Sequence, residues 1–180
     1  MSDFLPTLTA TTASVTVMER PCGGFFQIAA WPETLPAVVT ALSDITDLPV
    51  TTAPGGSVYD SELCVMAVAP GRFLLQCAAG QRGACLSALQ ASITDDLGAV
   101  TDLSDARSCF RLSGEAAALV LAKGMPLDLH ASSFPVGKVV QSAIHEIAVV
   151  VRRARHNEFD IYGYRSFAQD LLHWLTVASR

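Results

Sequence analysis

Between residues 24 and 103, short apolar runs alternate with segments of helical periodicity. The runs long and apolar enough to form strands are 25–31, 63–69, 73–77 and 99–103. A helix is expected to begin at Pro32, and a loop to run from Asp44 to Ser57. Pro70 and Gly71 predict a tight turn between the second and third runs. A second helix, with Cys85, Leu89 and Ile93 on one side, precedes the fourth run. This order predicts a split β-α-β unit of the ferredoxin-like type.

The segment from residue 107 onward also mixes strands with helices. Strands are predicted at 108–112, 139–151 and 159–162, the second of them interrupted near His145. A short helix at 116–122 is expected to be capped by Ser113 and to end at Gly124 in a left-handed conformation. A charged hairpin tip is expected at 152–158.

The last helix is predicted to start with Ser166 and Gln169, which have the spacing of a capping box. Its apolar stripe would consist of Phe167, Leu171, Trp174, Leu175 and Ala178. The sequence therefore predicts an α+β protein of two ferredoxin-like halves packed together. Its parts would be an extended N-terminal arm at 1–20, a ferredoxin-like half at 21–105 and a second α+β half at 106–180.

Composition narrows the class of protein. Only 16% of the 180 residues are charged and 51% are hydrophobic, whereas soluble domains average about 25% charged residues. The net charge of -5 argues against nucleic-acid binding, which needs a basic surface. Mean hydropathy is +0.38, but we expect no membrane-spanning helix and no signal peptide. The low charge fits either an alanine-rich proteome or a permanent subunit with surfaces covered by partners.

Five cysteines at irregular spacings, with no C-x-x-C pair, are typical of a reducing compartment. We therefore expect a cytoplasmic protein whose thiols behave as small buried hydrophobic groups. Charge is unevenly distributed, since residues 1–106 are acidic and residues 107–180 are basic. This asymmetry fits either the orientation of a docking partner or an ordinary solvated surface.

The motifs of common catalytic sites are absent from the sequence. It contains no G-x-G-x-x-G, no G-x-x-x-x-G-K-[ST] and no G-x-S-x-G. The four histidines do not have the spacing of zinc ligands. The sequence therefore predicts no catalytic, cofactor-binding or metal-binding residue in this chain.

A few side chains still carry hypotheses. Asp128 and His130 would share a face of an extended segment, either as an acid–base couple or, as we favour, as a pair that anchors a loop. Arg165 would pair with Asp160 or contact a partner. The arginines at 152, 153 and 155 would bind an anion or a carboxylate-lined partner or, as we favour, lie at a solvated hairpin tip.

Several short phrases in the second half together resemble the gamma subunit of bacterial heterotetrameric sarcosine oxidase. The resemblance covers residues 99–178, and upstream only the hairpin at 68–75 is similar to the wider aminomethyltransferase-like superfamily. The specific element is Pro-Leu-Asp-Leu-His at 126–130 followed by Phe-Pro at 134–135. The other phrases lie at 101–107, 112–114, 121–124, 136–137, 159–162, 165–168 and 173–175.

The resemblance implies a chain without an active site inside a four-subunit enzyme that demethylates sarcosine to glycine. Its partners would be the alpha, beta and delta subunits. FAD, FMN, NAD, tetrahydrofolate and zinc would lie in those subunits, and Asp128, His130 and Arg165 would be structural or interface residues. Two alternatives stay open, a stand-alone folate-binding module of the aminomethyltransferase-like superfamily and a scaffolding module that forms homo-oligomers.

Overall fold

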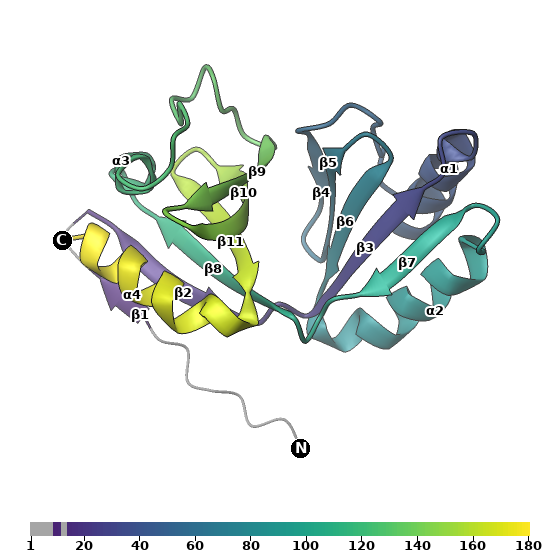
Figure 1. The fold of residues 1–180 in the computed structure, drawn as a ribbon, viewed down its shortest axis with the longest axis horizontal. Coiled ribbons are helices and arrows are strands. Elements are labelled where there is room, and N and C mark those ends of the chain that lie inside the picture. The colour runs from purple at the N-terminus through teal and green to yellow at the C-terminus, as the bar shows by residue number, and fades with distance from the viewer. Residues whose placement is uncertain (1–8, 12–13) are drawn as a thin grey trace. The chain divides into compact units, whose positions relative to one another are not determined.

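The computed structural model describes residues 9–11 and 14–180, which form a mixed α/β protein with two antiparallel sheets (Figure 1). The chain divides into two compact units. Unit 1 comprises residues 1–21, 108–136 and 141–180, and unit 2 comprises residues 22–107 and 137–140. The described part of the chain has four α-helices, none of them long and apolar enough to cross a membrane.

Unit 2 contains a five-stranded sheet with the order β4-β5-β6-β3-β7. Every neighbouring pair in it is antiparallel. The strands are β3 (Gly24–Ala30), β4 (Ser57–Tyr59), β5 (Leu63–Ala69), β6 (Arg72–Cys77) and β7 (Gly98–Asp102). The helices are α1 (Leu35–Thr46) and α2 (Arg82–Ser92), and the short 3-10 helix η1 (Ala79–Gln81) precedes α2. All four strands predicted between residues 24 and 103 are confirmed.

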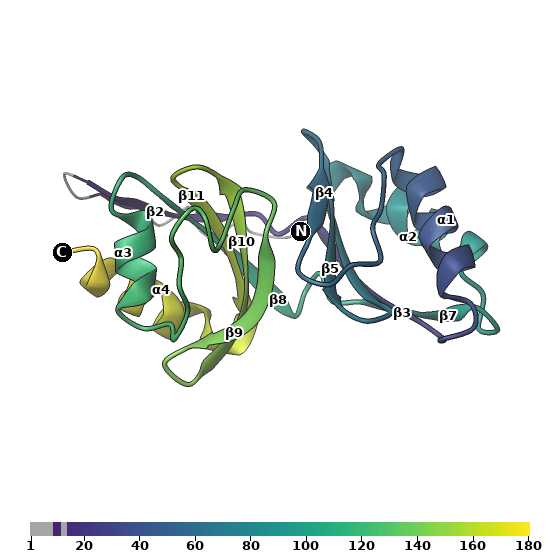
Figure 2. The same ribbon diagram turned by 90° about the horizontal axis from the view of Figure 1, so that it is seen from above.

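Both helices of unit 2 pack on one face of its sheet (Figure 2). The alternate residues of the strands that point toward the helices are apolar, as the pleat of a strand requires. With the inward residues of α1 and α2 they form one buried cluster: Phe26, Ile28, Val38, Leu42, Val65, Ala67, Phe73, Leu75, Cys77, Leu89 and Ile93. The predicted face of the second helix, with Cys85, Leu89 and Ile93, is therefore confirmed.

The boundaries of α1 differ from the prediction. The helix begins at Leu35 and not at Pro32, because residues 32–34 form a turn whose Thr34 hydroxyl donates to the carbonyl of Trp31 at 3.2 Å. It ends one turn later than expected, where Asp47 adopts a left-handed conformation with φ 54°. The predicted loop from Asp44 to Ser57 was therefore too long, and its last residue begins the short edge strand β4.

Unit 1 contains a six-stranded sheet with the order β1-β2-β8-β11-β10-β9. Its elements are β1 (Thr9–Thr11), β2 (Thr16–Arg20), β8 (Arg107–Ser113), α3 (Ala117–Ala122), β9 (Val139–Ile144), β10 (Ile147–Arg155), β11 (Glu158–Tyr164), the short 3-10 helix η2 (Arg165–Phe167) and α4 (Ala168–Ala178). The N-terminal strand β2 pairs antiparallel with β8, so Val17 lies opposite Leu112. Two segments about ninety residues apart in sequence thus lie side by side.

The core of unit 1 lies between its sheet and its helices. It contains the fully buried Val17, Phe110, Leu112, Val151, Phe159, Ile161, Leu171 and Leu175. On β11, Gly163 has the same orientation as Ile161, and a Cβ atom there would lie only 2.9 Å from Cδ2 of Leu171 in α4. This close approach of sheet and helix identifies the face of the sheet that α4 covers.

Several local predictions in unit 1 were wrong because tertiary contacts replaced the expected capping. Ser113 belongs to β8 and does not cap α3, whose N-cap is Ala116. Gly124 does not have a positive φ angle. It is small because the indole of Trp174 would lie 2.4 Å from a Cβ atom at that position. Ser166 lies within η2 and makes no capping box, since the N-cap of α4 is Phe167.

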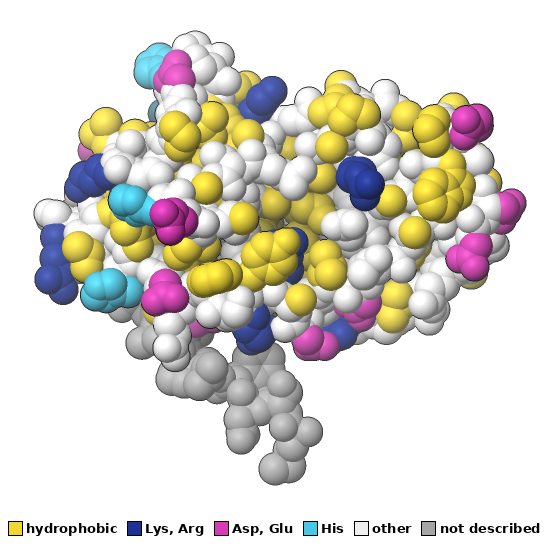
Figure 3. Space-filling model, in the orientation of Figure 1, with side chains coloured by type: hydrophobic (Ala, Val, Ile, Leu, Met, Phe, Trp, Pro, Cys, Tyr) yellow, Lys and Arg dark blue, Asp and Glu magenta, His cyan; other side chains and the backbone are white. Residues whose placement is uncertain are grey.

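The last helix buries most of its predicted stripe. Leu171 and Leu175 are fully buried, and Trp174 is half-buried with its ring 5.5 Å from that of His145. Phe167 is the exception, because it precedes the helix and is 46% exposed. Hydrophobic side chains also reach the surface elsewhere, as the yellow atoms in Figure 3 show. The large ones are Met18, Trp31, Tyr59, Leu119, Val136, Tyr164, Phe167 and Val177.

Candidate functional site

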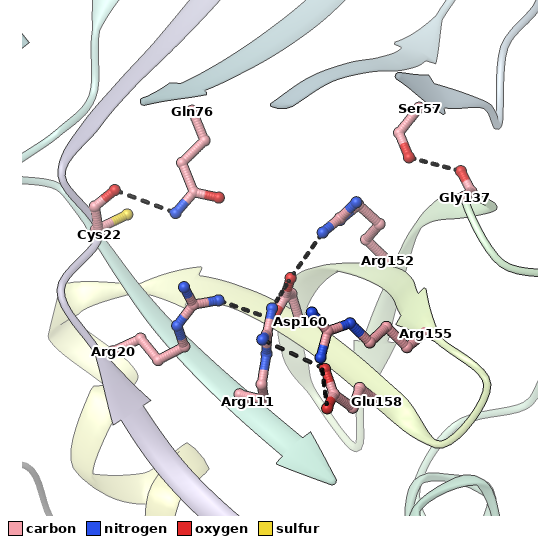
Figure 4. Close-up of polar contacts among 10 residues, drawn as sticks. All are labelled: Arg20, Cys22, Ser57, Gln76, Arg111, Gly137, Arg152, Arg155, Glu158 and Asp160. Carbon is pink, nitrogen blue, oxygen red and sulfur yellow. Dashed lines mark hydrogen bonds and ion pairs between the residues drawn. The ribbon is translucent and has the colours of Figure 1, made fainter. Parts of the chain in front are cut away.

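The main polar cluster of unit 1 is centred on the carboxylate of Asp160 in β11 (Figure 4). Arg111 donates from Nε to Oδ1 at 2.7 Å and from Nη2 to Oδ2 at 2.9 Å. Arg152 donates from Nη2 to Oδ2 at 3.0 Å, and Arg20 from Nη1 to Oδ1 at 3.5 Å. We call these residues, with Glu158 and Arg155, the Asp160 network.

Four neighbouring strands supply the network. Arg20 comes from β2, Arg111 from β8, Asp160 from β11 and Arg152 from β10, which is the order of these strands in the sheet. Arg152 lies directly opposite Asp160 in the β10–β11 register, so the two side chains share a face. Because Gly163 faces α4 and the side chains of a strand alternate, Asp160 points to the other face of the sheet.

The network is buried at its centre and accessible at its margin. The side chains of Asp160 and Arg152 are 2% and 7% exposed, whereas that of Arg20 is 39% exposed. Glu158 joins the margin, with Oε2 3.3 Å from Nη1 of Arg111 and Oε1 3.6 Å from Nη1 of Arg155. A charge this deeply buried is tolerated only when it is paired and hydrogen-bonded, as Asp160 is.

The ionisation of Asp160 follows from its neighbours. Burial of the carboxyl raises its pKa and is the largest influence, but Arg111 and Arg152 together outweigh it, so the pKa lies below the usual value. The same balance acts on Arg111. Burial lowers the pKa of its guanidinium group, but the contacts with Asp160 raise that pKa by more, so the net shift is upward. Asp160 and Arg111 are therefore both charged at neutral pH.

The expected hairpin tip at 152–158 was wrong, because β10 continues to Arg155 and β11 starts at Glu158. Arg153 is buried on the face opposite to Arg152 and 5.0 Å from the ring centroid of Phe159. It donates to the carbonyl oxygens of Phe134 at 2.7 Å, Leu129 at 3.4 Å and His156 at 2.7–2.9 Å. Arg153 thus anchors the loop at Leu129 and Phe134, on either side of His130.

Asp128 and His130 lie in that loop, which is not extended as the shared-face argument assumed. The backbone N–H of His130 donates to Oδ1 of Asp128 at 2.9 Å, and the Ser133 hydroxyl donates to Oδ2 at 2.5 Å. These hydrogen bonds, that of Ser133 first, hold the pKa of Asp128 below its usual range. The ring of His130 contacts the hydroxyl of Ser132, with Nδ1 2.9 Å from Oγ. Both residues are exposed, and their contacts organise the loop.

Arg165 opens η2 and is exposed. The proposed pairing partner Asp160 is instead surrounded by Arg20, Arg111 and Arg152. The contact of Arg165 with a partner subunit stays a prediction.

In unit 2 a smaller ion-pair cluster joins the start of α2 to the end of β7. Arg82 pairs with Asp105 at 2.8 Å and with Asp102 at 3.0 Å. Burial raises the pKa of Asp102, but the hydrogen bonds from Ser104 and Arg82 lower it by more than burial raises it. The net shift is therefore downward. The Ser104 hydroxyl also accepts from the backbone N–H of Phe25 at 2.9 Å. This cluster therefore fastens the edge of the sheet.

The thiols and potential metal ligands show no separate site among the residues that the structure describes. None of the five cysteines, all at described positions, forms a disulfide, and four of them are buried. Burial, followed by the contact with Cys85, raises the pKa of Cys77 to about 12, so that this thiol stays protonated. No cluster of three or more His, Cys, Asp or Glu side chains at 9–11 and 14–180 has the arrangement of a metal site.

Comparison with known families identifies the chain. A model described as the sarcosine oxidase gamma subunit family matches residues 28–180. The chain belongs to this family. It is 36% identical over 139 residues to sarcosine oxidase subunit gamma of Corynebacterium sp. (strain U-96), a match that covers 77% of this chain and 67% of that protein. It is also 38% identical over 115 residues to sarcosine oxidase subunit gamma of Corynebacterium sp. (strain P-1). That match covers 63% of this chain and 55% of that protein.

Solved structures extend this family assignment to the fold. A chain of the heterotetrameric sarcosine oxidase from Corynebacterium sp. U-96, in complex with pyrrole 2-carboxylate, matches with a TM-score of 0.85 and 31% identity, over 94% of this chain and 87% of that chain. Glycine cleavage system aminomethyltransferase T from Bartonella henselae matches with a TM-score of 0.68 and 18% identity, over half of its length. The second likeness shows a shared fold alone.

The Asp160 network is the feature of this gamma-family chain that sequence reasoning missed. Asp160, Arg111 and Arg20 are far apart in sequence, and only the first was considered, as a partner for Arg165. Part of the signal was present nonetheless, since β11 alternates Glu158 and Asp160 with the apolar Phe159 and Ile161 and so places both carboxylates on one face. Charges that share one face of neighbouring strands are expected to meet.

Proposed function

We propose that this chain is the non-catalytic structural gamma subunit of a bacterial flavin-dependent heterotetrameric sarcosine oxidase. The supporting observation is the match to a chain of the heterotetrameric sarcosine oxidase from Corynebacterium sp. U-96. The match covers 94% of the present chain, with 31% identity and a TM-score of 0.85. The complex would oxidatively demethylate sarcosine to glycine, with hydride transfer to flavin, capture of the one-carbon unit by tetrahydrofolate and reoxidation of the flavin by oxygen. The gamma subunit would shape the assembly.

The partners would be the alpha, beta and delta subunits, and FAD, FMN, NAD, tetrahydrofolate and zinc would be held by them. Exposed apolar side chains such as Leu119, which is 70% exposed, support a role in assembly, because a partner that covers them removes apolar surface from water. The polar side chains of the Asp160 network bind one another, which suits a structural role.

Each half would be a ferredoxin-like unit, and the division into 1–20, 21–105 and 106–180 describes its parts along the chain. The strand order β5-β6-β3-β7, with α1 after β3 and α2 after β6, supports this for unit 2. In unit 1 the order β2-β8-β11-β10 supports it as well, with α3 after β8 and α4 after β11. In that unit β2, from the N-terminal segment, would take the place of the final strand.

Asp128, His130 and Arg165 would be structural or interface residues. Support comes from their exposure and from the hydrogen bonds by which Arg153 anchors the loop at Leu129 and Phe134. A fixed, exposed loop loses little conformational entropy on binding, which favours its use in an interface.

The test is affinity purification of the tagged chain from its native host under mild conditions, followed by absorption spectroscopy and a sarcosine-dependent oxygen-consumption assay. We expect a yellow complex with one large, one medium and one very small additional polypeptide and with oxidase activity. A colourless chain that elutes alone would refute the proposal. Tight tetrahydrofolate binding by that lone chain would then favour the folate-binding module, and a homodimer without such binding would favour the scaffolding module.

A further inference from the structure

The charges of the Asp160 network do not balance. It contains four guanidinium groups, from Arg20, Arg111, Arg152 and Arg155, but only the two carboxylates of Asp160 and Glu158. Asp160 already accepts two hydrogen bonds on each oxygen, which uses its full acceptor capacity. Among these six side chains, positive charges outnumber negative charges by two.

The excess persists at neutral pH. Arginine stays protonated in proteins, and Asp160 is ionised because its pKa lies below the usual value. Proton release cannot remove the surplus, so water, mobile counterions or a bound anion must balance it. The network thus favours the approach of a negatively charged group.

Accessibility defines where such a group would enter. Exposure of the side chain rises from 7% at Arg152 and 24% at Arg111 to 39% at Arg20 and 76% at Arg155. Figure 4 shows Arg20 and Arg155 on opposite sides of Arg111. The two hydrogen bonds from Arg111 to Asp160 fix the guanidinium plane of Arg111, so this donor is already oriented before an anion arrives.

The immediate surroundings favour a protein ligand over a free small anion. Met18 lies directly opposite Arg111 in the β2–β8 register, so the two share a face, and Met18 is 40% exposed. A carboxylate that arrives on a polypeptide can pair with the arginines while its neighbouring residues cover the apolar Met18. A free anion would leave that apolar surface in water.

We propose that Arg20, Arg111, Arg155 and Met18 form a docking site for an aspartate or glutamate side chain of a partner subunit. This inference rests on the proposed function, because it names the chemistry by which the gamma-family chain would bind that partner. The carboxylate would complete the Asp160 network at its accessible margin. Electrostatic complementarity of this kind raises association rates and specificity.

The test compares the affinity of two double variants for the purified partner subunits. Arg20→Gln with Arg155→Gln removes the two weakly held charges, whose contacts within the chain are 3.5 and 3.6 Å long, and leaves Arg111 and Arg152 on Asp160. Arg72→Gln with Arg180→Gln removes two exposed charges elsewhere. We expect the first pair to weaken binding by about tenfold or more and to reduce its salt dependence, and the second pair to change neither.

Three outcomes would overturn the inference, and they are distinguishable. If the native chain itself does not bind the subunits, the proposed function fails as well. If the native chain binds and the Arg20/Arg155 variant binds equally tightly, only the docking site fails. If citrate raises the melting temperature of the native chain but not of that variant, while assembly is unaffected, the site takes a free carboxylate. The single variant Arg155→Gln, at a 76% exposed position, repeats the assay without risk to folding.

Discussion

The two sheets of this protein differ in what they place on the face turned away from their helices. In unit 2 that face contains the buried Phe25, Met66 and Leu74 together with Cys64. In unit 1 the corresponding face contains the Asp160 network. Both faces include residues that are almost fully buried, but those named on the first are uncharged, whereas those on the second include the ion pair of Asp160 and Arg152.

The difference shows in the strands themselves. Leu63–Ala69 is an unbroken apolar run, which is typical of a strand buried on both faces. Glu158–Tyr164 alternates charged or aromatic residues with apolar ones, because only the face toward α4 is purely hydrophobic. An apolar face tolerates variation in volume, whereas an ionic face requires every partner to be present.

The largest effect is expected from Asp160→Asn. This change removes the charge that pairs with three arginines, one of them buried, and should lower the free energy of unfolding by about 4 kcal/mol. The chain has two tryptophans, Trp31 in unit 2 and Trp174 in unit 1. Urea denaturation followed by Trp174 fluorescence in a Trp31→Phe background measures the effect. Asp170→Asn, at an exposed position, is the control, and a loss below about 1 kcal/mol for Asp160→Asn would contradict the ionic account.

A somewhat smaller effect is expected on the apolar face of unit 2. Met66 is fully buried, and Met66→Ala should cost about 3 kcal/mol through lost burial and the cavity left behind. The readout is urea denaturation followed by Trp31 fluorescence in a Trp174→Phe background, at low and high salt. Because no charge is involved, the loss should be independent of salt, and Met66→Leu should recover most of it. A strong salt dependence would remove the contrast between the two faces.

Acid distinguishes the two faces further. The folded-state pKa of Asp160 is lowered, so its contribution to stability is complete above the ordinary aspartate pKa of about 4 and is lost as pH falls through the lower folded value. The difference in unfolding free energy between the native chain and Asp160→Asn should therefore narrow as pH falls below about 4. The corresponding difference for Met66→Ala should not change with pH. This prediction would be refuted if the difference in unfolding free energy between the native chain and Asp160→Asn stayed constant down to about pH 2.

The smallest effect is expected for the exposed ion pairs of unit 2. The side chain of Arg82 is 38% exposed, so Arg82→Gln should cost about 1 kcal/mol or less despite its two partners. Urea denaturation at low and high salt measures it, and salt should reduce the cost because exposed pairs are screened. A loss as large as that of Asp160→Asn would mean that burial does not decide the strength of these pairs.

Element types were largely predictable because they depend on local patterns. The strands β5, β6 and β10 and the helices α1 and α2 were found from apolar runs and from repeats at three and four residues. Helix ends were less predictable, because Ser113 and Ser166 have capping sequences but lie in β8 and η2. The resemblance of the second half to the sarcosine oxidase gamma subunit was also readable from short phrases, and the family comparison confirmed it.

The roles of residues that depend on distant neighbours could not be predicted from the sequence. Gly124 has the sequence position of a helix stop, yet it is small because Trp174 packs against it. Arg152 and Arg153 look like two adjacent surface charges, yet the pleat directs one to Asp160 and the other to the carbonyl oxygens of a loop. In each case the deciding partner lies many residues away, beyond the reach of a local pattern.

The sequence by itself therefore determined the kinds of element, their order, the apolar face of most helices and the family. Only the tertiary structure decided that β2 joins the sheet beside β8, and that Arg20, Arg111, Arg152 and Asp160 meet on one face. The physical reason is the range of the interactions involved. Backbone conformation and amphipathic periodicity act over a few residues, whereas strand pairing and buried ion pairs join segments that are close only after the chain has folded.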